Sequence, residues 1–195
     1  MQKWTLSILS LAFFIFSANL TAANTTEALA KYRSWHDVCL QGDVKKIDAQ
    51  IDKFEHQVAT NPKDTLAKAF LGSACALRAK YGKWGPTKLK YLKRGRKLME
   101  GAVASSPKDA RVRMVRAIAY SRIPKRFKVK STAIKDFQTL IPLAQSGENL
   151  TPSERQAILY YAALTYRSEK LTGANELMAQ CKKIDPKSKY GRSAK

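Results

Sequence analysis

The feature that most constrains the fold is a helix-start signal that occurs three times at a spacing of 45 residues. It reads NPKD at 61–64, SPKD at 106–109 and TPSE at 151–154. Each copy has a residue that commonly caps helices, then a proline suited to the first helical position, then an acid that favours the first turn. The third copy also matches a capping box. The signal predicts three helices, each capped by the first residue of its motif.

The residues downstream of each proline repeat one apolar spacing. Positions five, eight and twelve residues after the prolines fall on one face of a helix, and they are Ala67, Phe70 and Ala74, then Val112, Val115 and Ala119, then Ala157, Tyr160 and Leu164. The tenth position is small each time, as Gly72, Ala117 and Ala162. We therefore expect close contact between helices at this position.

Each of these helices is followed by a second helical pattern. The inward-facing residues are predicted to be Leu89, Leu92, Gly95, Met99 and Ala102, then Ala133, Phe137 and Leu140, then Ala174, Met178 and Cys181. An earlier pair covers 26–40 and 43–60, with Ile47, Ile51, Phe54 and Val58 on the inner face. The pattern predicts an all-α chain in which about four helical hairpins stack over 24–186 as a right-handed solenoid.

At this point the sequence resembles the tetratricopeptide-repeat family over about 59–186. The residues that carry the likeness are Ala162, Ala174, Met178, Cys181 and Asp185 with Pro186, and in the earlier units Leu71, Gly72, Gly95, Met99, Ala102 and Pro107. The aromatic that the family places early in each first helix is replaced by Lys68, Arg113 and Ile158. Membership would imply a protein-binding scaffold rather than an enzyme.

The N-terminal residues 1–23 have the order of a secretory signal peptide. Lys3 precedes an apolar run over 6–16, and small residues follow at 21–23. A retained membrane anchor is the alternative, but the run is shorter than the roughly 20 apolar residues that span a bilayer. The order predicts export to the periplasm or the cell exterior. The C-terminal residues 187–195 lack a core pattern, so they are predicted to form a mobile basic tail.

Basic charge is concentrated in the middle of the chain. The net charge is +21, and residues 78–135 contain 19 Lys or Arg but only two acids. On the helix expected over 86–105, four bases share the face opposite the apolar stripe, which predicts a solvated basic face. They are Lys90, Lys93, Arg94 and Lys97.

Two lengthened turns, 80–88 and 122–130, join helices within hairpins and should lie on one edge of a solenoid. We call their bases and aromatics the basic edge, which consists of Lys80, Lys83, Trp84, Lys88, Lys125, Arg126, Phe127, Lys128 and Lys130. The hypothesis is that this edge binds an acidic protein or peptide, steered by its field. Anionic lipid or glycan is the alternative partner. For each ring taken singly, packing beneath its own turn is the competing interpretation.

A second candidate surface follows from the resemblance, which implies a concave groove lined by the first helices. The matching positions are Arg111, Met114, Arg122, Leu159, Tyr166 and Arg167. Arginine and tyrosine at these positions would suit a peptide with acidic or carboxylate groups.

The sequence contains no recognisable catalytic motif, and it predicts neither a metal nor a cofactor. His36 and His56 lack metal-ligand spacing and are expected at the surface or its boundary. Cys75 and Cys181 fall in apolar helical patterns and are expected to be small buried hydrophobes, although a disulfide among the three cysteines stays open. The charge alone would suit nucleic acid, but the predicted export and the lack of a nucleic-acid-reading motif argue against it.

Overall fold

The computed structural model describes residues 27–83 and 85–195. The predicted signal peptide and Trp84 lie outside these ranges. Throughout the described ranges all regular structure is helical and no strand occurs, which confirms the predicted all-helical class.

Helix 27–40 comes first. The remaining α-helices are α2 (Val44–Thr60), α3 (Thr65–Tyr81), α4 (Gly85–Ser105), α5 (Ala110–Arg122), α6 (Lys130–Ser146), α7 (Pro152–Ser168), α8 (Ala174–Ile184) and α9 (Lys189–Ser193). A short 3-10 helix, Lys125–Phe127, lies between α5 and α6. No helix in the described part of the chain is both long enough and apolar enough to cross a membrane.

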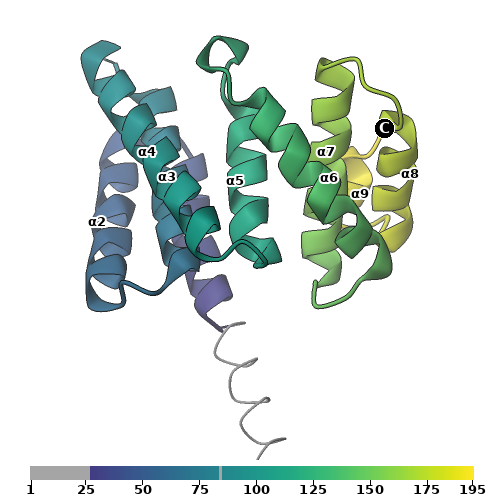
Figure 1. Ribbon diagram of the computed structural model, residues 1–195, viewed down its shortest axis with the longest axis horizontal. Coiled ribbons are helices and arrows are strands. Elements are labelled where there is room, and N and C mark those ends of the chain that lie inside the picture. The colour runs from purple at the N-terminus through teal and green to yellow at the C-terminus, as the bar shows by residue number, and fades with distance from the viewer. Residues whose placement is uncertain (1–26, 84) are drawn as a thin grey trace, which may run out of the picture.

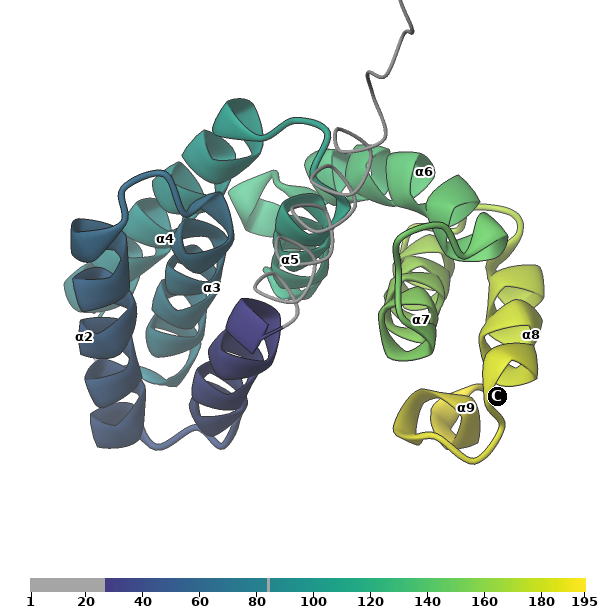
Figure 2. The same cartoon turned by 90° about the horizontal axis from the view of Figure 1, so that it is seen from below.

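Neighbouring helices pack in adjacent pairs. α3 packs on α4, α5 on α6 and α7 on α8, and α3, α5 and α7 also contact one another in sequence order. The pairs follow an arc, with helix 27–40, α5 and α7 along its inner side (Figure 2). The turns within the pairs α3–α4, α5–α6 and α7–α8 lie on one edge, at the top of Figure 1. We call this the turn edge.

Only one of the three repeated signals begins its helix as predicted. Thr151 caps α7 with Pro152 in the first turn, and Glu154 completes the capping box. In the other two copies the cap is the final aspartate, so α3 and α5 start three residues later than predicted. Asp64 accepts a hydrogen bond from the Ala67 backbone N–H, and Asp109 accepts from two first-turn N–H groups of α5.

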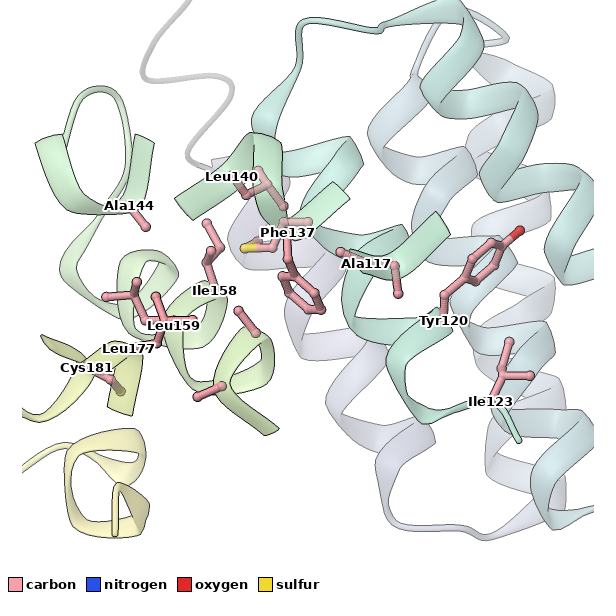
Figure 3. Packing of buried hydrophobic residues seen from close by; sticks show 14 of the residues in the cluster. Ala117, Tyr120, Ile123, Phe137, Leu140, Ala144, Ile158, Leu159, Leu177 and Cys181 are labelled. Atoms are coloured by element: carbon pink, nitrogen blue, oxygen red, sulfur yellow. The ribbon is translucent and has the colours of Figure 1, made fainter. Parts of the chain in front are cut away.

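The apolar stripes of the second helices form the core as predicted, with one exception. All the predicted inward residues of α4, α6 and α8 are buried except Leu89, which is 48% exposed. Phe137 and Leu140 of α6 pack toward Ile158 of α7 (Figure 3). The stripe of the first helices is buried in α3 but weakens in α7, where Leu164 is 39% exposed.

The close helix contact expected at the tenth position is present between α3 and α4. A Cβ added to Gly72 would lie 2.7 Å from the Gly95 carbonyl oxygen, and one added to Gly95 would lie 2.5 Å from the Gly72 carbonyl oxygen. The two glycines therefore let the helix backbones touch.

The C-terminal residues differ from the expected mobile tail. They form α9, which Ser188 caps by accepting from the Gly191 backbone N–H. Tyr190 packs on the rings of Tyr160 and Tyr161, and Ala194 is buried. The tail therefore belongs to the packed structure beside α7 and α8.

Candidate binding surfaces

Most arginines of the basic middle segment form ion pairs with carboxylates of the same chain. Six of them pair with carboxylates: Arg78 with Asp48, Arg94 with Glu55, Arg96 with Glu100, Arg111 with Glu154, and Arg113 and Arg116 with Asp136. All but the Arg96 pair join different helices, so these charges hold the fold together rather than face a partner.

Two of the carboxylates are fully buried. Asp136 of α6 lies 2.9 Å from Arg113 and 2.8 Å from Arg116, both on α5. Glu154 lies 2.7 Å from Arg111 and 3.4 Å from Arg33 of helix 27–40. Burial raises the pKa of Glu154, but the hydrogen bond from the Thr151 backbone N–H and the Arg111 guanidinium outweigh it, so the net pKa lies below the ordinary value.

Most lysines of the basic edge are free of such pairs. Lys125 forms an ion pair with Glu169 at 3.1 Å, and this pair joins the α5–α6 turn to the start of the α7–α8 turn. Lys130 donates a hydrogen bond to the Ser121 carbonyl. Lys80, Lys83, Lys88 and Lys128 form no ion pair with any carboxylate of residues 27–83 and 85–195. These four lysines therefore give the turn edge a positive charge that no carboxylate of the described residues neutralises.

The basic helix face of α4 adjoins this edge. Lys90, Lys93 and Lys97 are exposed, whereas Arg94 is held by Glu55 of α2. Three of the four predicted bases thus remain outside ion pairs.

Phe127 is the one ring of the basic edge that the structure describes. It is partly buried against the core, and the Arg126 guanidinium lies over it at 4.9 Å. This placement agrees with packing beneath its own turn.

A groove of about 1190 Å³ occupies the inner side of the arc. Helix 27–40 and α3 form one wall, α5 the floor, and α7 with α9 the other wall (Figure 2). Four bases gather where the groove meets the turn edge, namely Lys80, Lys88, Arg122 and Arg126. The groove and the basic edge are therefore continuous.

The structure brings only part of the predicted groove set together. Met114 and Arg122 line the groove, while Leu159 is buried in the core. Arg111 is held by Glu154, and Tyr166 packs against the core outside the groove. Arg167 donates to Asn175 and to the Lys195 carbonyl, on the far side of α7.

The groove also contains residues that the sequence did not assign to a binding surface. Leu40 and Leu89 are 45% and 48% exposed and line it, as do Arg33, Asp37 and Tyr190. The signal that could have found Leu89 is its place near Gly85 and Pro86, in the first turns of α4, rather than in the middle of that helix.

The three cysteines and His36 lie within the packed helices. Cys39, Cys75 and Cys181 are buried and unbridged, which confirms the prediction for Cys75 and Cys181, and burial raises the pKa of each thiol. His36 donates to or accepts from the Ser73 hydroxyl at 2.8 Å, and burial lowers its pKa to about 4. Within the described ranges, no group of three or more His, Cys, Asp or Glu side chains is placed to hold a metal.

No protein-family model, curated protein or solved structure matches this chain.

Proposed function

We propose that the chain is an exported, non-catalytic scaffold of the tetratricopeptide type that binds an acidic protein or peptide through the basic edge. The observation that carries this proposal is the difference between the two basic residue types. Six arginines of the basic middle segment pair with carboxylates, while most lysines of the turn edge and of α4 stay unpaired among the described residues; these unpaired lysines are Lys80, Lys83, Lys88, Lys128, Lys90, Lys93 and Lys97.

The arrangement of the pairs also supports a scaffold. Adjacent helix pairs whose first helices contact one another, with their turns on one edge, are the arrangement that a right-handed solenoid of four hairpins would have. Its edge would present a row of flexible ammonium groups, which steer an acidic partner and make binding depend on salt.

The test is photo-crosslinking from position 83 in the compartment to which the chain is exported. We expect an acidic protein as the product, and the same purified protein should bind the purified chain with salt-sensitive affinity. Lys83→Glu with Lys90→Glu should weaken that binding at least tenfold, because both lysines are exposed and outside ion pairs.

Lys63→Glu with Lys108→Glu is the matched control, since it removes the same charge from exposed positions in the turns at the opposite edge. Equal weakening by both double variants would show a bulk charge effect and count against a specific edge. Salt-sensitive co-sedimentation with anionic but not neutral vesicles, without a protein crosslink, would replace the protein partner by an anionic lipid or glycan surface.

A further inference from the structure

We propose that the groove is a binding site for a single-chain anionic amphiphile of the long-chain carboxylate type. The anionic head would lie at the turn edge, and the hydrocarbon chain would run along the floor of the groove. This site shares Lys80, Lys88 and Arg126 with the basic edge, but neither Lys83 nor Lys90, the two lysines that test the protein partner, lines the groove.

The charges of the groove are arranged from one end to the other. Lys80, Lys88, Arg122 and Arg126 lie at its turn end, and none of them pairs with a carboxylate of the described chain. Elsewhere in the groove Asp37 and Asp185 offset Arg33 and Lys189. One end is therefore strongly basic, which matches a ligand with a single anionic end.

Two of the four bases already have hydrogen bonds that orient but do not neutralise them. The Lys80 ammonium donates to the Tyr81 hydroxyl at 3.3 Å, and Arg122 donates to the Tyr161 hydroxyl at 3.3 Å. A carboxylate placed among them would gain charge-assisted hydrogen bonds.

The floor of the groove is lined by apolar side chains. Phe70, Met114 and Ile118 line it, and the backbone there is engaged within α3 and α5. Of the polar side chains deeper in the groove, Ser73 bonds His36, and the Gln156 amide donates to two carbonyls. An extended peptide would leave its backbone groups without partners on this floor, whereas a hydrocarbon chain requires none.

Exposed apolar side chains gather at this groove. In the described part of the chain four large hydrophobic residues are exposed, and two of them, Leu40 and Leu89, line it. The volume of about 1190 Å³ exceeds the roughly 300–1,000 Å³ of pockets that hold drug-sized ligands. The groove is thus large enough for a long hydrocarbon chain. The two leucines at its rim would cover that chain.

The test is calorimetric titration of the purified chain with dodecanoate, with dodecanol, which has the same chain but no charge, and with decanoate and octanoate. We expect one dodecanoate to bind per protein chain and dodecanol to bind at least tenfold more weakly. The affinity of the carboxylates should fall by up to about fourfold for each methylene removed from the hydrocarbon chain. Equal affinity for dodecanoate and dodecanol, or no binding of dodecanoate, would overturn the proposal.

Variants distinguish binding in the groove from non-specific binding to the protein surface. Lys80→Gln with Lys88→Gln should weaken dodecanoate about tenfold and leave dodecanol unchanged. Leu89→Ser should weaken both ligands, whereas Leu171→Ser should weaken neither, because Leu171 is 40% exposed but outside the groove. Equal effects of the two serine variants would show non-specific adsorption and sink the site. Dodecanoate should still bind the variant Lys83→Glu with Lys90→Glu. The result for dodecanoate is then independent of whether the proposed protein partner binds.

Discussion

The acid at the end of each helix-start motif acts differently according to its length. Aspartate is short enough to cap the helix itself, so Asp64 and Asp109 receive first-turn N–H groups and the preceding proline lies in the turn. Glutamate is one methylene longer and reaches back to the Thr151 backbone N–H from the third helical position. The two motifs that end in aspartate thus start their helices three residues later in the motif than the one that ends in glutamate.

Replacing the two candidate caps of α3 tests this assignment. Asp64→Ala should lower the free energy of unfolding by about 1–2 kcal/mol, because it leaves the Ala67 N–H and the Tyr32 hydroxyl without their acceptor. Asn61→Ala should stay within about 0.5 kcal/mol. Urea denaturation of both variants provides the comparison, and a larger loss for Asn61→Ala would restore the cap predicted from the motif.

His36 should make stability depend on pH. Its pKa is lowered to about 4 in the folded chain, below the ordinary value of about 6.5. Between these values the unfolded chain binds a proton that the folded chain excludes, so the stability is complete above about pH 6.5 and is lost as pH falls.

Because of His36, the free energy of unfolding should be lower at pH 5 than at pH 7.5 by up to about 2 kcal/mol. Urea denaturation at both values measures it, and His36→Gln, which can still bond the Ser73 hydroxyl, should remove that part of the pH dependence. An unchanged difference in the variant would assign the effect to carboxylates instead.

At the scale of helices, the tightest contact is the crossing of α3 and α4 at Gly72 and Gly95. Gly72→Ala should destabilise the fold by roughly 1–3 kcal/mol, because its Cβ would meet the Met99 side chain and the Gly95 carbonyl. Gly101→Ala in α4 is the matched control. Its Cβ would approach only the end of the Lys68 side chain, at 3.6 Å, so this change should stabilise by about 0.5–1 kcal/mol.

Thermal unfolding of both glycine variants shows whether the close approach matters. Stabilisation by Gly72→Ala as well would mean that the helices separate there without cost.

The helices were predictable from sequence to the extent that their apolar period was regular. The stripes of α4, α6 and α8 follow steps of three and four, and burial matches them apart from Leu89. The ion pairs between helices were not predictable, because the acid partner lies far along the chain, as for Arg111 and Glu154, which are 43 residues apart. Hence Arg111 of the groove set could not be told from a free arginine, and Leu40 could not be placed in the groove.

For the whole molecule, α9 closes the C-terminal end of the arc. Deleting residues 187–195 removes Tyr190 from the Tyr160 and Tyr161 rings, exposes the surface that covers Ala194, and takes from Arg167 the Lys195 carbonyl. We expect the free energy of unfolding to fall by roughly 2 kcal/mol, which corresponds to about 4–8 °C in Tm for a chain of this size. Calorimetry measures it, and an unchanged Tm would restore the mobile tail predicted from composition.

The division of labour between guanidinium and ammonium groups also makes the protein's two kinds of charge chemically separable. Reagents that acylate amines leave arginine untouched, so acetylation would remove the lysine charges from the turn edge and from α4, while Arg122, Arg126 and the arginine–carboxylate pairs of the fold persist. The folded chain could therefore be converted from a strongly basic to a nearly neutral particle without a single substitution.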